Sequence, residues 1–445
     1  MKQQIRLSDH FTYRKLLQFV FPSIVMMIFT SIYVVVDGLF VSNFVGKTPF
    51  AAVNLIYPFL MILGALGFML GTGGSAIVSK TLGEGKPEKA NQYFSMLVYV
   101  AIAGGIVLAL AGFVSLRPIA KAIGAEGATV DDCVLYGRFI LPALPAFMLQ
   151  NVFQSFFVAA EKPHLGLKIT VAAGCTNMLL DFLLVAVFPF GLAGAAVATA
   201  VSQLVGGLVP LFYFGRPNGS LLRLTSAKPD LSILAKACTN GSSELMTNVS
   251  LSLVNILYNI QLIRIIGEDG VAAYGVITYV NFIFIAIFLG YAVGSAPIVS
   301  YHYGAGNPGE LKGLFCKSLV ITAIAGIFLT AAAMILSLPL SKVFVGYDAG
   351  LLELTCHGFQ LFSFSFLFSG FNIFGSAFFT ALNNGFVSAA ISFLRTLVFQ
   401  IAAVFVLPVF MGLDGIWLAA AGAELLALVV TVLFFVRERK TYRYA

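Results

Sequence analysis

Charged residues are scarce in this 445-residue chain: Asp, Glu, Lys and Arg together make up only 10% of it, while 59% of the residues are hydrophobic. Soluble domains carry about 25% charged residues, and a soluble globule could not cover this much apolar surface. Apolar runs recur along the chain at about the 20 residues needed to cross a hydrocarbon core about 30 Å thick. The composition therefore excludes a soluble domain and predicts a protein embedded in a lipid bilayer.

Residues that commonly build metal and catalytic sites are also few. The five cysteines form no C-x-x-C pair and are odd in number, which argues against a disulfide framework or a zinc site. The four histidines are scattered, and the sequence has neither an H-E-x-x-H motif nor a G-x-x-x-x-G-K-[ST] phosphate loop. We therefore expect no cofactor, no drive by ATP and no enzymatic activity.

The basic residues indicate the orientation of the chain. The net charge of +7 could suggest nucleic-acid binding, but the Lys and Arg residues lie in short loops between apolar runs rather than on one soluble face. If the N-terminus is inside the cell, most of the 26 Lys and Arg residues fall on that side, as the positive-inside rule requires. This pattern predicts a multi-pass protein of the cell membrane, with both termini cytoplasmic and no nucleic-acid partner.

Twelve apolar runs are long enough to be membrane spans. The first is too long for a signal peptide and contains an aspartate, so we expect it to be retained. The runs lie near residues 16–41, 51–78, 93–115, 135–159, 168–189, 193–214, 238–262, 271–299, 314–338, 355–381, 388–409 and 415–436. The longest polar break, residues 215–237, lies midway along the chain.

The two halves of the chain are similar to each other. A shift of 221 residues places Gly73, Gly83, Gly85 and Pro87 on Gly294, Gly304, Gly306 and Pro308. Each half has an even number of spans, so both start on the same face and are parallel repeats. The sequence therefore predicts an all-α polytopic membrane protein with twelve transmembrane helices in two parallel six-helix repeats. Its parts are an N-terminal lobe (1–214), a cytoplasmic linker (215–237) and a C-terminal lobe (238–445), and since one chain supplies both lobes we expect a monomer.

Charged residues inside the apolar runs are the candidates for function, because a charge at the bilayer centre costs about 2.5–3.5 kcal/mol on insertion scales. Asp37 and Asp181 each follow a polar residue, Tyr33 and Asn177, by four positions, which puts each pair on one helix face. Such oxygen ligands can hold either Na⁺ or a proton. The alternative is that each aspartate only bonds a neighbouring helix.

The repeat favours the functional interpretation. At the offset of 221, Asp37 falls on Tyr258 and Asp181 on Ala402, while Asn177 and Thr199 also fall on apolar residues. The second half therefore repeats the helices but not the polar groups. A set of polar groups present once indicates a cation site in the first half.

Three further charges lie in apolar runs of the second half. Glu244 lies in a polar stripe with Asn248 and Asn255, which predicts an acidic wall of a central cavity suited to cations; a helix-end glutamate near the headgroups is the alternative. Arg395 either pairs with a carboxylate or extends to the interface. Glu424 falls on Gln203 at the same offset, which favours a structural role.

With these features the sequence resembles the MATE (multidrug and toxic compound extrusion) transporter family over essentially its whole length. The shared features are the twelve spans, the aspartate of the first span, and the G-x-G-x-P loop after the second and eighth spans. The Asn-x-x-x-Asp of the fifth span resembles the DinF-like branch. The resemblance implies a MATE/MOP-type fold and a cation-coupling site in the N-terminal lobe formed by Asp37, Asp181, Asn177, Thr199 and Tyr33, with Na⁺ possible at Asp37, Asp181 and Asn177.

The resemblance also implies an activity. The family exports small organic cations and drugs, in antiport with H⁺ or Na⁺, by alternating access. The related flippases for lipid-linked oligosaccharides share the architecture and are the alternative, but a cavity that binds diphosphate should be strongly cationic. Here the intramembrane charges are mostly acidic, with Arg395 as the exception. An intramembrane enzyme would need a nucleophile–base pair or a metal motif that the sequence lacks.

Overall fold

The computed structural model describes residues 5–444, and this part of the chain is helical without any strand. Lys2, one of the basic residues behind the predicted orientation, lies outside the described residues. The N-terminal half comprises α1 (Tyr13–Phe40) with η1 (Val41–Val45), α2 (Lys47–Gly83), α3 (Pro87–Ala122), α4 (Ala128–Ile140) with η2 (Leu141–Ala143) and α5 (Leu144–Ala159), α6 (Pro163–Asp181) with η3 (Phe182–Val187), and α7 (Gly191–Gly215). The C-terminal half comprises α8 (Leu231–Ile266), α9 (Glu268–Gly304), α10 (Pro308–Val345), α11 (Ala349–Ser363), α12 (Phe366–Ala381), α13 (Gly385–Phe393) with η4 (Leu394–Val398) and α14 (Phe399–Met411), and α15 (Leu413–Tyr442).

These helices confirm the twelve predicted spans. Eleven of the described helical stretches are long and apolar enough to cross a membrane, and the pair α11–α12, bent by 48°, supplies the twelfth. Large apolar side chains such as Val114, Val343 and Phe410 are exposed on the outside, as expected for a surface in contact with lipid. Most helices extend past the predicted apolar runs by a turn or two.

Local sequence signals determine several helix ends. Gly85 and Gly306 adopt positive φ angles (73° and 64°) after α2 and α9, and Pro87 and Pro308 occupy the first positions of α3 and α10. The two G-x-G-x-P loops are therefore tight turns, as predicted. The predicted linker, residues 215–237, overlaps the start of a helix: Asp230 caps α8 through bonds from Ser232 N–H and Ile233 N–H, so the helix begins at Leu231.

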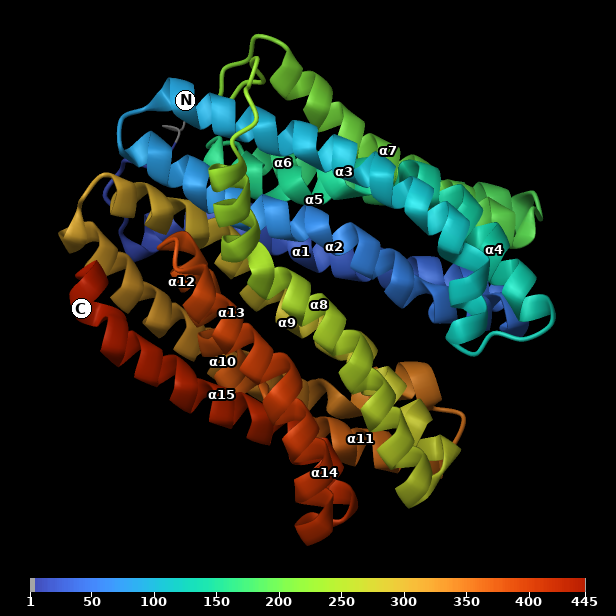
Figure 1. Cartoon of the computed structure of the whole chain (residues 1–445). Helices are drawn as coiled ribbons and strands as arrows, with labels where there is room; N and C mark the ends of the chain where they lie inside the picture. The colour runs from blue at the N-terminus through green and yellow to red at the C-terminus, as the bar shows by residue number, and fades with distance from the viewer. Residues whose placement is uncertain (1–4, 445) are drawn as a thin grey trace.

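The two halves meet along α1, α2, α8 and α9, and a glycine pair related by the repeat brings them close. A Cβ atom on Gly83 would meet the carbonyl oxygen of Tyr301, and a Cβ on Gly304 would meet that of Lys80. Since Gly83 and Gly304 are equivalent at the offset of 221, these contacts are the two symmetric versions of one interaction. In Figure 1 the halves lie together near the two termini and diverge toward the end occupied by α4, α11 and α14.

The segment before α1 crosses this closed end. Leu7 N–H donates to Glu161 Oε1 (2.6 Å) between α5 and α6, and Phe11 N–H donates to Glu310 Oε1 (2.8 Å) at the start of α10. Leu7 and Phe11 are fully buried, in a cluster with residues of α9, α10 and α12. We call residues 5–12 the N-terminal strap, because they tie the N-terminal half to the C-terminal half.

Candidate functional site

A cavity of about 700 Å³, open space at its mouth included, lies within the N-terminal half. We call it the N-half cavity. It combines aromatic and aliphatic walls with a small set of polar groups, which is typical of small-molecule sites. Its lining includes Tyr33, Asp37, Tyr57, Tyr136, Phe147, Asn177, Thr199, Ser202 and Gln203, from α1, α2, α4, α5, α6 and α7.

Asp37 is the acidic group of this cavity. Its Oδ1 accepts hydrogen bonds from the hydroxyl of Thr199 (3.3 Å) and from the amide of Asn177 (3.5 Å). These bonds join α1 to α7 and α6 at one carboxylate. Tyr33, one turn before Asp37, lines the same cavity. The structure thus brings four of the five predicted cation-coupling residues to one cavity.

Asp181, the fifth predicted residue, is fully buried beside this group and does not itself line the N-half cavity. It ends α6, and the π-helical segment η3 follows directly. Neither of its carboxylate oxygens has a hydrogen-bond partner among the described residues. Its carboxyl is close enough to that of Asp37 for the two charges to interact. A buried acid without a partner demands either a proton or a bound cation, since an isolated charge there is strongly unfavourable.

The equivalent positions of the second half are arranged differently. Tyr258, the residue at the position of Asp37, is buried, stacks on Tyr274 with centroids 4.7 Å apart and donates to Gln400 Oε1 (3.0 Å). The space that holds a carboxylate in the first half is therefore filled by packed rings in the second.

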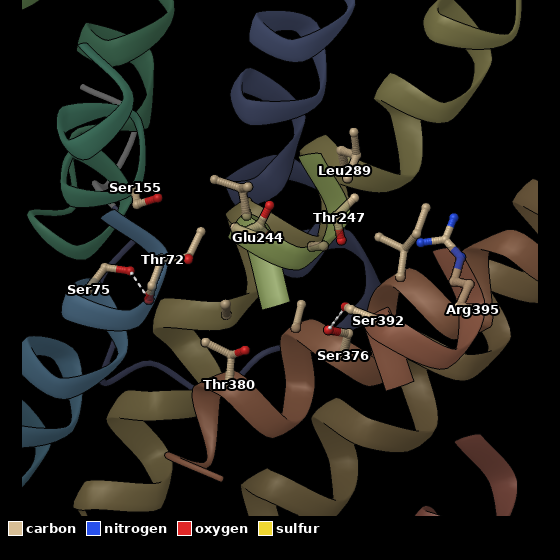
Figure 2. Close-up of a pocket in the computed structure, with 15 residues that line it drawn as sticks. Thr72, Ser75, Ser155, Glu244, Thr247, Leu289, Ser376, Thr380, Ser392 and Arg395 are labelled. Atoms are coloured by element: carbon tan, nitrogen blue, oxygen red, sulfur yellow. Dashed lines mark hydrogen bonds between the residues drawn. The ribbon is translucent and has the colours of Figure 1, made fainter. Parts of the chain in front are cut away.

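A second cavity, of about 630 Å³ with its mouth included, lies between the two halves and is called the central cavity here. Its lining includes Thr72, Ser75 and Ser155 of the N-terminal half, and Glu244, Thr247, Leu289, Ser376, Thr380, Ser392 and Arg395 of the C-terminal half. Figure 2 shows Glu244 on α8 and Arg395 on η4 with Thr247 between them in that view. The predicted cavity residue Glu244 therefore does line a cavity between the halves.

The other two predicted cavity residues, Asn248 and Asn255, are not among the residues that line the central cavity. The amide of Asn248 donates to the backbone oxygen of Glu244 (2.8 Å), and Asn255 Oδ1 accepts from the hydroxyl of Tyr274 (3.1 Å). Helical spacing gives the face of a residue but not the partner that its side chain finds, and a role of these two amides in ligand binding stays a prediction.

Arg395 pairs with a carboxylate, which was one of the two predicted alternatives. Its Nε donates to Glu424 Oε1 (2.8 Å), and both side chains are nearly buried. The amide of Asn372 donates to Glu424 Oε2 (2.7 Å), and Thr431 donates to Asn372 Oδ1 (2.9 Å). A chain of four residues from three elements, η4, α15 and α12, thus holds the guanidinium in place.

Sequence reasoning missed several polar residues. Asn372 carried a usable signal, because it falls on Asn151 at the offset of 221 and both are buried. A ladder of hydroxyls along α12 and α13 joins Ser376 to Ser392 (2.8 Å) and Thr380 to Ser388 (2.7 Å). Serine and threonine are common in membrane helices, so nothing in the sequence distinguished these from lipid-facing ones.

Comparison with known proteins agrees with this architecture. The family model described as MatE matches the chain twice, over residues 22–183 and 245–406. The "Multidrug export protein MepA" of Staphylococcus aureus (strain MRSA252) is 23% identical over 435 residues, which covers 96% of this chain and 95% of that protein. MepA of Staphylococcus saprophyticus is 22% identical with the same coverage.

Two solved structures are similar along their whole length. The crystal structure of MATE in complex with MaL6 has a TM-score of 0.93 at 20% identity, and covers 100% of both chains. A structure described as the outward-facing conformation of a multidrug resistance MATE family transporter of the MOP superfamily has a TM-score of 0.93 at 21% identity, covering 100% of this chain and 99% of that one. These likenesses concern the fold.

Proposed function

The chain belongs to the MatE family of membrane transporters, and we propose that it is an antiporter that exports small organic cations in exchange for H⁺ or Na⁺. The family comprises multidrug efflux transporters rather than enzymes, and the chain is a multi-pass membrane protein. The observation that carries the coupling proposal is the pair of acids in the N-terminal half. Asp37 faces the N-half cavity, and Asp181 is buried beside it with no hydrogen-bond partner among the described residues.

The two acids can act as a switch. With both ionised, the carboxylates repel each other in apolar surroundings, which disfavours their close approach. A proton or Na⁺ removes this repulsion, and Asn177 and Thr199 supply further oxygen ligands. Because Asp37 is on α1 and Asp181 at the end of α6, loading and unloading the cation changes how these two helices pack. The N-half cavity changes shape with them and releases its organic cation.

The side to which the protein opens is inferred from its closed end. We place both termini in the cytoplasm on the positive-inside rule, which puts the contact of Gly83 with Tyr301 and the N-terminal strap at the cytoplasmic face. The halves diverge toward the other end, so the described conformation opens outward (Figure 1). The protein then works as a monomer in the plasma membrane, with the halves rocking between outward-open and inward-open states.

A flippase for a lipid-linked oligosaccharide is the competing function. It would require positive charge in the central cavity, where Arg395 is already paired with Glu424 and Glu244 adds a second carboxylate. The charges therefore support export of cations.

The test is efflux of the cationic dye ethidium from proteoliposomes under an imposed gradient. The wild type should move ethidium against its gradient when driven by either pH or Na⁺, and the effective ion identifies the coupling cation. Asp37→Asn should be inactive under both gradients. The control Asp414→Asn changes an exposed carboxylate in the first turn of α15 and should be active. Gradient-independent dye movement, or wild-type rates in Asp37→Asn, would exclude the proposed coupling.

A further inference from the structure

The central cavity is lined by one charged side chain of each sign, and each keeps hydrogen-bonding groups that no described residue uses. Glu244 and Arg395 both line it, and they come from α8 and η4 of the C-terminal half. The remaining polar lining consists of hydroxyls, including Thr72 and Ser155 from the N-terminal half. The N-half cavity differs, because its charged lining residue is acidic. The two cavities therefore present different charge patterns to a ligand.

The guanidinium of Arg395 hydrogen-bonds to the protein through Nε, and its two terminal nitrogens stay available to a ligand. Nε donates to Glu424, whose other oxygen is held by Asn372. Among residues 5–444 neither terminal nitrogen of Arg395 has a hydrogen-bond partner. The Arg395 side chain borders the cavity and is 13% exposed, whereas that of Glu424 is 6% exposed. A planar guanidinium fixed at one edge presents its other donors in the geometry that suits a carboxylate or phosphate.

Glu244 is the complementary group. Its carboxylate makes no hydrogen bond or ion pair with any of the described residues, and it faces the same cavity as Arg395 (Figure 2). Glu244 and Arg395 are near enough for their charges to interact, yet they do not form a salt bridge with each other. Both groups therefore remain accessible to a ligand in the cavity.

We propose that the central cavity recognises zwitterionic amphiphiles, with the cationic group of the substrate at Glu244 and a carboxylate at the terminal nitrogens of Arg395. This inference rests on the proposed transport function and names a substrate class for a second site, which lies between the halves and is distinct from the N-half cavity. The hydroxyls of Ser376, Thr380 and Ser392 also line this cavity. A diphosphate is disfavoured, since Glu244 and Glu424 would both repel its additional negative charge.

The alternative is that Arg395 only stabilises the fold through Glu424. A structural role requires the Nε bond but predicts no dependence of ligand affinity on an anionic group. A matched pair of dyes separates the two roles: rhodamine B, which carries a cation and a free carboxylate, and its ethyl ester, which carries the cation alone. Binding to purified full-length protein in detergent is measured by fluorescence polarisation, with protein-free micelles as the blank.

The wild type should bind rhodamine B more tightly than the ester by roughly tenfold, because hydrogen bonds between charged groups contribute that much. The double variant Arg395→Gln with Glu424→Gln removes both partners, so it leaves no unpaired buried charge. It should bind the two dyes equally and keep the wild-type affinity for the ester. Arg395→Lys retains the charge but lacks the fork, and it should lose most of the preference. Glu244→Gln should weaken binding of both dyes by a similar factor.

Equal affinities in the wild type, no binding of rhodamine B, or a preference that survives in the double variant or in full in Arg395→Lys would each overturn the inference. The proposed function has a separate readout in gradient-driven efflux of the ester. If that efflux depends on Asp37 while the wild type shows no dye preference, the antiport proposal is supported and the zwitterion site is excluded. A dye preference without gradient-driven efflux would support the zwitterion site and exclude the proposed antiport.

Discussion

The hydroxyl of Thr199 donates to Oδ1 of Asp37 across the interface between α7 and α1, at 3.3 Å. This bond is one of two that tie the cavity-facing acid to neighbouring helices. It stabilises the ionised form of Asp37, and an oxygen at that position can also serve as a ligand for Na⁺. Thr199 is therefore expected to set how tightly the coupling cation is held.

Thr199→Val keeps the shape of the side chain and removes its hydroxyl. We expect the cation concentration for half-maximal efflux to change by roughly tenfold, because a hydrogen bond to a charged group contributes about 1.5–3 kcal/mol. The direction of the change identifies the coupling ion. Loss of the hydroxyl weakens a Na⁺ site, whereas Asp37 holds a proton more tightly once the hydroxyl no longer donates to Oδ1. The measurement is initial dye efflux against pH and against Na⁺, with Thr199→Ser as the control that keeps the oxygen. An unchanged dependence in Thr199→Val would contradict a coupling role.

Asp181→Asn should abolish gradient-driven efflux without lowering stability. Both carboxylate oxygens of Asp181 lack hydrogen-bond partners among the described residues, so the amide breaks no existing bond and removes a buried ionisable group. We expect a melting temperature of the purified protein equal to or above that of the wild type, with efflux at background. A structural role predicts the reverse: a lower melting temperature with efflux retained.

The N-terminal strap gives a pH prediction outside the membrane. Burial raises the pKa of Glu161 above its ordinary value of 4.5, although Leu7 N–H donates to it and favours the ionised form. The folded state therefore binds this proton more tightly than the unfolded state does. The contribution of Glu161 to the free energy of unfolding is fully present below its pKa in the unfolded state. It declines as pH rises from about 4.5 through its pKa in the folded state.

Glu161→Gln keeps an oxygen for Leu7 N–H and cannot ionise. We expect this variant to gain stability relative to the wild type as pH increases above 4.5, and to show the smallest difference at or below that pH. Melting temperatures of both proteins over a pH series measure this. Parallel curves for the two proteins would show that burial of Glu161 has no thermodynamic effect.

The sequence predicted the architecture because its evidence was local. Twelve apolar runs and the two G-x-G-x-P loops are each set by neighbouring residues, and the helices end accordingly. The repeat also predicted which glycines would be equivalent. The repeat could not predict which helices meet at a given residue. The bonds of Asn372 to Glu424 and of Arg395 to Glu424 join residues on different helices, so they depend on how those helices are rotated about their axes.

The acids of the first half were predictable for a different reason. A charge in an apolar run is conspicuous, and comparison with Tyr258 and Ala402 showed that the second half lacks it. The polar stripe that included Asn248 is a weaker signal, because neutral amides can bond to their own helix backbone, as Asn248 does. Charged groups identify sites more reliably than amides, because a hydrogen bond to the backbone of their own helix does not compensate for burial of the charge.

The glycine contacts at the closed end allow a test of the symmetric packing of the halves. Gly83→Ala places a methyl group against the carbonyl oxygen of Tyr301 and the amide of Ala305, and both are backbone atoms that cannot turn away. We expect a loss of about 1–3 kcal/mol, typical of an overpacked contact. Gly304→Ala should have the same effect, because it meets the carbonyl of Lys80 in the equivalent geometry. Gly104→Ala in α3, where a Cβ meets no atom within 4 Å, is the control and should be neutral or slightly stabilising.

The double variant of Gly83 and Gly304 distinguishes one shared interface from two independent ones. If both glycines serve a single close approach of α2 and α9, the first substitution already separates the helices and the second costs less than it does alone. The melting temperature should then fall by less than the sum of the single effects. Dye efflux should be impaired in all three variants, since the closed end no longer seals. Additive losses, or a Gly104→Ala variant as damaged as Gly83→Ala, would mean that the helices do not meet through these two residues.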